Sequence, residues 1–171
     1  MKLHLVDLDV VLVEQWRRAF RDHSEVTITA GDILAQTQVG ALVSPANGLG
    51  FMDGGIDACY RDYFGPRIER RVQAAIGLRP DGLLPVGASI LIATDDSRFP
   101  YLIVAPTMTM PERVPPSHAY RAMRAALRVV AEHWNRIERV YCPGLCTGVG
   151  GVPPDMAAAE MAAAYRDWKK P

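Results

Sequence analysis

The segment ALVSPANGLGFMDGGID, residues 41–57, joins a short apolar stretch to a glycine-rich loop and then to the start of a helix. Ala41, Leu42 and Val43 have the composition of a buried strand, and the breakers from Ser44 onward end it. In open α/β sheets, ligands bind at the carboxyl ends of strands, where such loops converge. Glycines there let backbone N–H groups approach a phosphate, and the next helix adds its positive N-terminus. The segment therefore predicts an anion-binding loop in an α/β protein.

A second loop of the same kind, PGLCTGVGG at residues 143–151, follows the apolar pair Val140 and Tyr141. Neither loop has the Gly-Lys-Ser/Thr of a P-loop or the G-x-G-x-x-G spacing of a dinucleotide-binding turn. Two glycine loops from different strands fit a ligand that is gripped on both sides, such as a diphosphate. On glycine content alone, tight turns without a ligand explain the two loops equally well.

Short apolar strands alternate with helices along the chain. The strands are expected at residues 3–6, 26–29, 41–43, 88–94, 101–105 and 140–141, and the helices at 10–22, 55–63, 65–77, 116–134 and 154–168. Asp9 is a good N-cap for the first helix, and Pro66 suits the first turn of the third. The alternation predicts a three-layer α/β/α fold with a mixed, mostly parallel central sheet of about six strands. No linker or repeat interrupts it, so residues 1–171 are expected to form a single domain.

The composition narrows the classes of function. Of the 171 residues, 49% are hydrophobic and 22% are charged, as in an ordinary globular protein. Nineteen basic residues balance nineteen acidic ones, so the basic excess of a nonspecific nucleic-acid binder is absent. Three cysteines and four scattered histidines give neither a disulfide framework nor a metal-ligand set. Without a signal-peptide layout or an apolar run of 18 residues, we expect a cytoplasmic protein with no membrane partner.

Four short motifs follow one another in a fixed order. They are Gly31-Asp32-Ile33, Ser44-Pro45-Ala46-Asn47, Gly54-Gly55-Ile56-Asp57 and Cys146-Thr147-Gly148-Val149-Gly150-Gly151. In this order, with Asp57 ten residues beyond Asn47, they resemble the motifs of the macrodomain family, whose fold binds ADP-ribose. The order of strands and helices also agrees over nearly the whole chain. Each motif alone is weak, and it is their combination that carries the resemblance.

The resemblance implies an adenine site and two diphosphate loops. Asp32 would accept a hydrogen bond from the adenine amino group, with the amide of Ile33 against the ring; capping of a short helix is the alternative. Asn47 would hydrogen-bond the distal ribose, and a turn-forming Asn before Gly48 is the alternative. The remaining ligand-binding residues implied by the family are Gly54, Gly55, Ile56, Cys146, Thr147, Gly148, Val149 and Gly150.

The hydrolases of this family imply a reaction for Asp57, because the matching Asp orients or activates a water near the anomeric carbon of the distal ribose. Asp53 breaks the family's usual three-glycine run and adds a second carboxylate, which would repel phosphate or act as a base. Gly150 stands where many hydrolase relatives have an aromatic residue. Its presence would widen the site or leave the ribose orientation to Phe51. Catalytic roles are therefore expected for Asp57, Asn47 and Asp53.

Other chemistries have weaker support. Cys146 stands where many relatives have Ser, and no basic neighbour in the sequence would lower the pKa of its thiol, which argues against a catalytic thiolate. No Lys lies in either loop, so the covalent Lys chemistry of one family branch is excluded. Arg61, Arg67, Arg70 and Arg71 follow the first loop, either as a solvated helix face or as charges that steer an anionic ligand.

Two functions follow from the resemblance. The leading one is binding of ADP-ribose and hydrolysis of an ADP-ribosyl ester, on a protein or in O-acetyl-ADP-ribose, by water attack that needs no metal and no cofactor. The alternative is a noncatalytic module that recognises ADP-ribose, free or on an ADP-ribosylated protein, or another nucleotide. The presence of Asp57 favours hydrolysis, whereas the missing loop aromatic favours binding alone.

Overall fold

A computed structural model describes residues 1–170 and contains one six-stranded sheet in the order β2-β1-β6-β3-β5-β4. The strands are β1 (Lys2–Asp7), β2 (Thr27–Ala30), β3 (Ala41–Ser44), β4 (Ile90–Ala93), β5 (Tyr101–Val104) and β6 (Arg139–Cys142). All neighbouring strands are parallel except β4 and β5, which form an antiparallel hairpin. The predicted mixed, mostly parallel sheet is confirmed.

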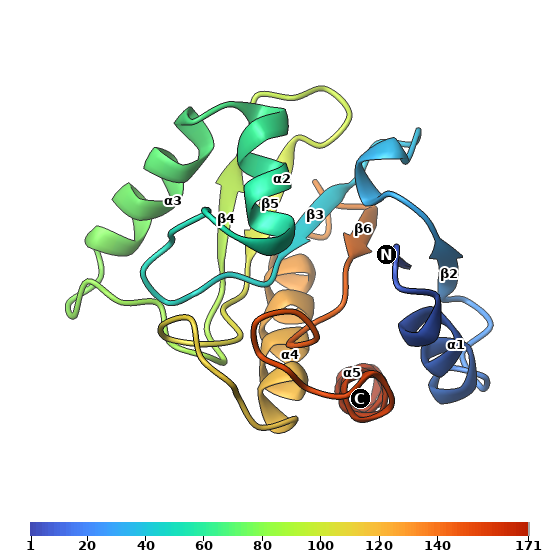
Figure 1. Cartoon of the computed structure of the whole chain (residues 1–171). Helices are drawn as coiled ribbons and strands as arrows, with labels where there is room; N and C mark the ends of the chain where they lie inside the picture. The colour runs from blue at the N-terminus through green and yellow to red at the C-terminus, as the bar shows by residue number, and fades with distance from the viewer. Residues whose placement is uncertain (171) are drawn as a thin grey trace.

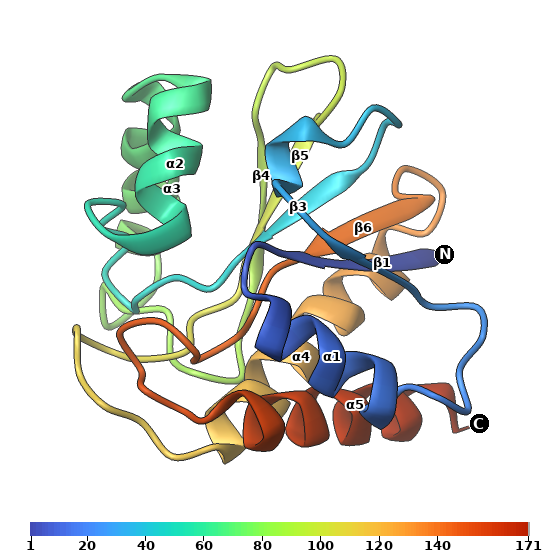
Figure 2. The same cartoon turned by 45° about the vertical axis from the view of Figure 1, so that its right-hand side comes forward.

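Helices cover both faces of the sheet (Figures 1 and 2). They are α1 (Val10–Ala19), α2 (Gly55–Phe64), α3 (Arg67–Gly77), α4 (Ser117–Glu132) and α5 (Pro154–Lys169), with a short 3₁₀ helix, η1, at Ile33–Ala35. Helices α1, α4 and α5 pack on one another and on one face, while α2 and α3 lie on the other. This arrangement gives the three layers predicted from the alternation of strands and helices.

The neighbouring strands β3 and β5 are almost entirely apolar, because both faces of the sheet are buried there. Successive side chains of a strand point to opposite faces. Val43 and Ile103 therefore belong to the core beneath α1, α4 and α5, and Leu42 and Leu102 belong to the core beneath α2 and α3. Burial on both sides explains why these strands read as continuous hydrophobic runs rather than as alternating patterns.

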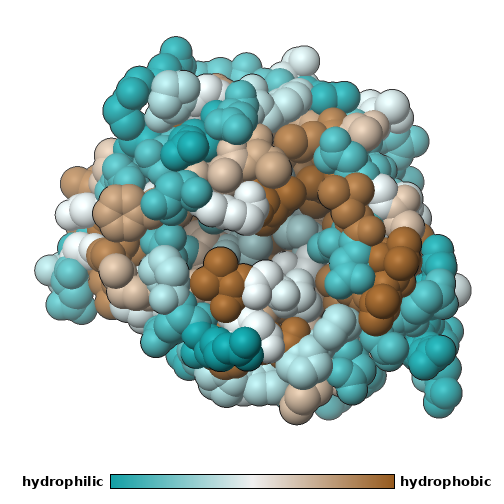
Figure 3. All heavy atoms as spheres, viewed as in Figure 1, coloured by the Kyte–Doolittle hydropathy of each residue, from teal (hydrophilic) through white to brown (hydrophobic). Residues whose placement is uncertain are grey.

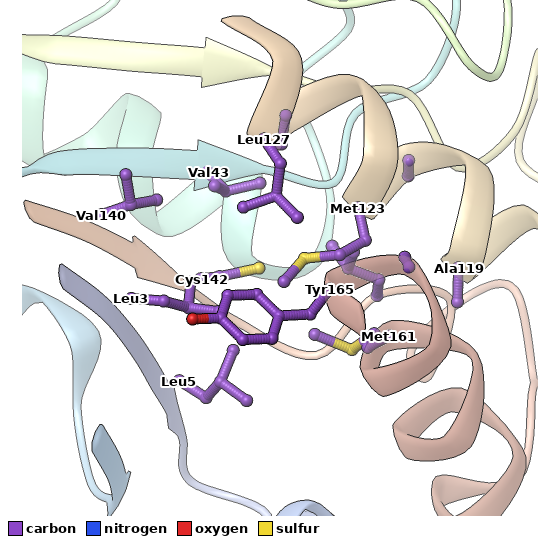
Figure 4. Packing of buried hydrophobic residues seen from close by; sticks show 14 of the residues in the cluster. Leu3, Leu5, Val43, Ala119, Met123, Leu127, Val140, Cys142, Met161 and Tyr165 are labelled. Carbon is purple, nitrogen blue, oxygen red and sulfur yellow. The ribbon is translucent and has the colours of Figure 1, made fainter. Parts of the chain in front are cut away.

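One apolar stripe of α4 is buried against the sheet and α5. Its members are Ala119, Met123, Ala126, Leu127 and Val130. Figure 4 shows Met123 and Leu127 between the strands that carry Val43 and Val140 and the helix that carries Met161. This packing fixes α4 and α5 as one layer beneath the sheet.

The predicted end of the first helix is wrong. Its start is confirmed, because Oδ1 of Asp9 accepts hydrogen bonds from the N–H groups of Val11 at 2.9 Å and Leu12 at 3.3 Å. The helix stops at Ala19, three residues earlier than expected, because the chain then turns. The N–H of His23 donates to the carbonyl of Phe20 at 2.8 Å, which closes that turn. The other predicted elements lie within two residues of the observed bounds.

The topology gathers distant loops at one edge of the sheet. Strands β1, β2, β3, β5 and β6 run parallel, so their carboxyl ends meet at the same edge. Because β4 is antiparallel to β5, the turn between them lies at the opposite edge. No helix within residues 1–170 has the length and apolar composition needed to cross a membrane.

Candidate functional site

A cleft of about 470 Å³ opens where the parallel strands end. This volume lies in the range usual for small-molecule sites. Figure 3 shows a hollow near the centre of one face, bordered by pale and brown surface of intermediate to high hydropathy. Every residue that the sequence analysis placed in the site lines this cleft: Asp32, Ile33, Asn47, Asp53, Gly54, Gly55, Ile56, Asp57, Cys146, Thr147, Gly148, Val149 and Gly150.

The amide of Asn47 holds the first loop in shape. Nδ2 donates to the carbonyl of Phe51 at 2.8 Å, and Oδ1 accepts from the N–H groups of Leu49 at 3.1 Å and Phe51 at 3.2 Å. These are the contacts of the turn-forming alternative. They occupy both acceptor positions of Oδ1 and leave one N–H of the amide to donate into the cleft.

Further contacts anchor the first loop to the rest of the protein. The N–H of Met52 donates to Oε2 of Glu69 on α3 at 2.6 Å, and the N–H of Gly48 donates to the carbonyl of Thr109 at 3.0 Å. Gly50 has a φ of 76° and packs against α3, where an added Cβ would come within 2.9 Å of Val72. The loop is therefore preorganised before a ligand arrives.

Two rows of backbone N–H groups belong to residues that line the cleft. No acceptor exists within residues 1–170 for the N–H groups of residues 53–57, which lead into the first turn of α2, or of residues 146–150. The first turn of any helix leaves such groups free, and here no side chain caps them. Both rows belong to residues that line the cleft, and unpaired backbone N–H groups of this kind are the donors that anion sites use.

The second loop has no room for an aromatic residue at position 150. Gly150 is buried, and an added Cβ would lie 2.8 Å from the carbonyl oxygen of Cys146 and 2.9 Å from Cγ2 of Val114. The N–H of Val114 also donates to the carbonyl of Gly150 at 3.0 Å. The expectation that Gly150 widens the site is therefore wrong where Val114 lies, because the segment before α4 fills the space beside Gly150.

Asp57 lies in the first turn of α2 with only 6% of its surface exposed. Oγ of Ser44, at the end of β3, donates to its Oδ1 at 2.6 Å. Burial raises the pKa of the Asp57 carboxyl from 3.8 to about 7, and the hydrogen bond from Ser44 acts in the opposite direction. A carboxyl group with a pKa near neutrality is suited to accept a proton from water.

Asp32 follows β2 and is exposed at the cleft. Its Oδ1 accepts a hydrogen bond from the N–H of Leu34 at 2.8 Å and caps η1, as the alternative interpretation expected. No donor to its Oδ2 is found within residues 1–170, so this oxygen is available to a ligand amino group. The backbone of Ile33 follows directly; this residue also lines the cleft, and it is buried.

The charged residues of the cleft are all acidic. The lining includes Asp7, Asp9 and Asp53 in addition to Asp32 and Asp57, but it contains no Lys, Arg or His. An anionic ligand in this cleft would therefore depend on backbone N–H groups. Nowhere in residues 1–170 do three or more His, Cys, Asp or Glu side chains gather as a metal site.

The arginines after the first loop do not line the cleft. Arg67 and Arg71 both pair with Asp95, which lies in the turn between β4 and β5. Arg61 lies 4.0 Å from Glu69, and Arg70 is exposed on α3. The structure thus agrees with the solvated-face interpretation of these four residues.

A protein-family model described as Macro domain matches residues 43–161, more than half of the chain. The chain belongs to the macro domain family. An Aquifex aeolicus protein is 33% identical over 146 residues, covering 85% of this chain and 83% of its own.

Solved macro domains share the fold. The macrodomain of Mycobacterium tuberculosis DarG has a TM-score of 0.69 at 21% identity, over 81% of this chain and 88% of that one. Thermosipho africanus DarTG, solved in complex with ADP-ribose, has a TM-score of 0.63 at 18% identity, over 83% of this chain and 39% of that one.

Cys146 in this macro domain is buried, and its backbone has a φ of 68°, in the left-handed region. Burial raises the pKa of its thiol to about 12, against a smaller opposite effect of the Thr107 hydroxyl. The thiol is therefore neutral at physiological pH, as is typical of a buried structural cysteine.

Several residues of the macro domain cleft were not found from the sequence. Thr107 and Met108 enter it from the segment after β5, and Asp7 enters it from the end of β1. One signal was present for Asp7, since it directly follows an apolar strand, as Asp32 nearly does. Ser44, which does not line the cleft, gave no separate signal, because its role depends on a contact with Asp57.

Proposed function

We propose that this macro domain binds ADP-ribose and hydrolyses an ADP-ribosyl ester, on a modified protein or in O-acetyl-ADP-ribose. The single observation that carries the proposal is the meeting, in one cleft, of two rows of free backbone N–H groups with the buried carboxyl group of Asp57. The N–H groups provide for a diphosphate without any basic side chain. Asp57 provides a proton acceptor beside them.

The positions of the loops suggest how the ligand lies. The adenine would contact Asp32 and Ile33, with its amino group donating to Oδ2 of Asp32. The diphosphate would lie between the start of α2 and residues 146–150. The distal ribose would then reach Asn47, Phe51 and Asp57, which line the same cleft.

The reaction is a displacement by water. Asp57 in its ionised form takes a proton from a water molecule, whose oxygen bonds to the anomeric carbon of the distal ribose. The bond from that carbon to the acceptor carboxylate breaks, and its electron pair leaves with the carboxylate. ADP-ribose and the free acceptor are the products, and the proton on Asp57 returns to solvent. With an O-acetyl ester, the same water attacks the acyl carbon, the bond from that carbon to the ribose oxygen breaks, and the ribose oxygen takes the proton from Asp57, which gives ADP-ribose and acetate.

Binding is tested first by calorimetric titration with ADP-ribose, with AMP as the comparison ligand. Gly148→Glu introduces a bulky carboxylate into the second loop, where an added Cβ has open space, so this variant should fold. It should weaken ADP-ribose binding at least about tenfold, or roughly 1.4 kcal/mol. Gly77→Glu is the matched control, since Gly77 also has open space but lies at the end of α3, outside the cleft. If the two variants bind ADP-ribose with equal affinity, the cleft is not the ADP-ribose site.

Hydrolysis is tested by following release of ADP-ribose from proteins modified on acidic side chains and from O-acetyl-ADP-ribose. Asp57→Asn should lower kcat about 10²–10⁴-fold, the usual contribution of general-base catalysis, while ADP-ribose affinity stays within a few-fold. A wild-type protein that binds ADP-ribose at micromolar concentration and releases none from either substrate would instead be a recognition module.

A further inference from the structure

Ser44 and Asp57 form a buried pair that joins β3 to α2. Oγ of Ser44 lies 2.6 Å from Oδ1 of Asp57, and the two residues are 1% and 6% exposed. This separation is in the range of a hydroxyl bonded to a charged carboxylate. A hydroxyl that donates to a carboxyl oxygen favours the ionised form of that group.

The other carboxyl oxygen of Asp57 is open to the cleft. Within residues 1–170, the only buried side-chain nitrogen or oxygen without a hydrogen-bond partner is Nε2 of His23. No donor to Oδ2 of Asp57 is found in the same part of the chain, so this oxygen is accessible, and Asp57 lines the cleft. One oxygen is thus held by the protein while the other remains free for water.

No cation near Asp57 compensates its charge. Tyr60 on α2 lies close enough for its charge to interact with that of Asp57, but burial raises the pKa of Tyr60 far above neutrality, so it supplies no charge. The lining of the cleft around Asp57 contains no Lys, Arg or His. Burial and the hydrogen bond from Ser44 are the two influences on the Asp57 carboxyl group. The Ser44 hydroxyl is therefore the one group in this neighbourhood that stabilises ionised Asp57 by a side-chain hydrogen bond.

We propose that Ser44 is the positioning residue for Asp57: its hydroxyl holds Oδ1 and leaves Oδ2 toward the attacking water. The inference rests on the hydrolysis proposed above and adds a residue that does not itself line the cleft. Ser44 acts only through Asp57, so removing its hydroxyl changes the protonation of Asp57 rather than the binding of ADP-ribose.

The first test follows the titration of the Asp57 carboxyl by NMR in the protein without ligand, which requires no activity. Ser44→Ala should raise the midpoint by about one pH unit or more, as expected when a hydrogen bond to a charged group is lost. Ser44→Thr keeps the hydroxyl and should restore the wild-type midpoint. Ser44→Cys keeps the side-chain volume but offers only a weak hydrogen-bond donor, so it should raise the midpoint as Ser44→Ala does. This variant serves in place of Ser44→Ala if the Ala variant folds poorly.

Ser89→Ala is the matched control. Oγ of Ser89 donates to the carbonyl of Ala125 at 2.7 Å, so this variant also loses a serine hydrogen bond, but it does so outside the cleft. It should leave the Asp57 midpoint unchanged. A midpoint in Ser44→Ala that equals that of the wild type overturns the inference, whatever substrate the protein uses.

The second test is the pH profile of hydrolysis. At pH 7, Ser44→Ala should lower kcat about tenfold, with recovery at higher pH as Asp57 ionises, and with KM within about twofold. A shifted midpoint with an unchanged kcat profile would overturn the role of Ser44 in turnover. A wild-type protein that binds ADP-ribose without turnover would overturn the hydrolysis itself, and the titration would still decide whether Ser44 controls Asp57.

Discussion

The carboxylate of Asp7 ties the end of β1 to the start of the second glycine loop. Its Oδ2 accepts a hydrogen bond from the N–H of Gly144 at 2.9 Å, and its Oδ1 accepts one from the N–H of Asp9 at 2.9 Å. Gly144 has no space for a side chain, because an added Cβ would lie 2.5 Å from Leu12. The Asp7 carboxylate thus fixes the backbone that leads into α1 and also the loop that follows β6.

Asp7→Ala should destabilise the fold and loosen the second loop. Two hydrogen bonds to a charged acceptor are lost, so we expect the free energy of unfolding to fall by about 1–3 kcal/mol. ADP-ribose affinity should fall several-fold, since the N–H groups of residues 146–150 are no longer held in place. Urea unfolding and calorimetry check the two effects. Asp22→Ala removes an exposed carboxylate that only approaches Arg21, and it serves as the control. Equal behaviour of the two variants would contradict the role given to Asp7.

The two glycines of the second loop should differ in their tolerance of a methyl group. Gly150→Ala forces a Cβ against Val114 and the carbonyl of Cys146, and overpacking of this kind costs about 1–3 kcal/mol. Gly148→Ala adds a Cβ in open space and should change the free energy of unfolding by less than about 0.5 kcal/mol. Thermal or urea unfolding of the pair measures the difference. If the two variants unfold alike, then Val114 and the carbonyl of Cys146 do not crowd a side chain at position 150.

The charge of Asp32 should contribute to ligand binding, in addition to the role of its side chain as the N-cap of η1. Asp32→Ala removes both the charge and the cap, whereas Asp32→Asn keeps a good N-cap for η1 and removes the charge. We expect ADP-ribose and AMP to bind Asp32→Ala about 10–150-fold more weakly, equivalent to about 1.5–3 kcal/mol for a lost charged hydrogen bond. Asp32→Asn should lose part of the affinity without loss of stability. If both variants bind with wild-type affinity, then Asp32 only caps η1 and does not contact the ligand.

The order of motifs in the sequence was enough to predict that they share one cleft, because three of the four come shortly after a parallel strand and the fourth begins the helix that follows β3. Asp32 follows β2, Asn47 follows β3 and residues 146–150 follow β6, so a parallel sheet brings them to one edge. The insertion of β6 between β1 and β3 was not predicted, since short strands of similar composition carry no signal for their partners. The contacts between Ser44 and Asp57 and between Asp7 and Gly144 join segments that only the folded sheet brings together.

The three thiols should separate into one reactive and two protected groups. Cys59 is exposed on α2 and lines the cleft, while Cys142 and Cys146 are buried. Burial raises the pKa of both buried thiols, so little thiolate is present at pH 8. A colorimetric thiol reagent should therefore react quickly with one group in the native protein and with three in denaturant. Rapid reaction of a second thiol in the native state would contradict the burial of Cys146. Cys59→Ser is the control that should abolish the fast phase.

The raised pKa of Asp57 should make stability fall as the pH rises toward neutrality. The unfolded chain loses the Asp57 proton near pH 3.8, whereas the folded protein keeps it until about pH 7. Between these values the folded state binds more protons, so the free energy of unfolding decreases with rising pH, by at most about 1.4 kcal/mol per unit. Asp57→Asn has no such titration. The difference in the free energy of unfolding between Asp57→Asn and the wild type should therefore grow from pH 4.5 to pH 7 and become constant above pH 8.

The difference in the free energy of unfolding between Asp57→Asn and the wild type reports on Asp57 and not on the other carboxyl groups. Glu25 has a pKa lowered to about 2 by a backbone hydrogen bond and by Lys169, so it contributes stability that is lost only as the pH falls below about 4.5. That contribution is common to both proteins and cancels in the comparison, since the sites share no partners. Urea unfolding at each pH, with identical salt, supplies the two curves. Curves that stay parallel from pH 4.5 to pH 8 would mean that folding leaves the pKa of Asp57 at its ordinary value. The carboxyl group would then be fully ionised at neutral pH in the folded protein, and the titration midpoint of Ser44→Ala would decide whether the Ser44 hydroxyl offsets the effect of burial.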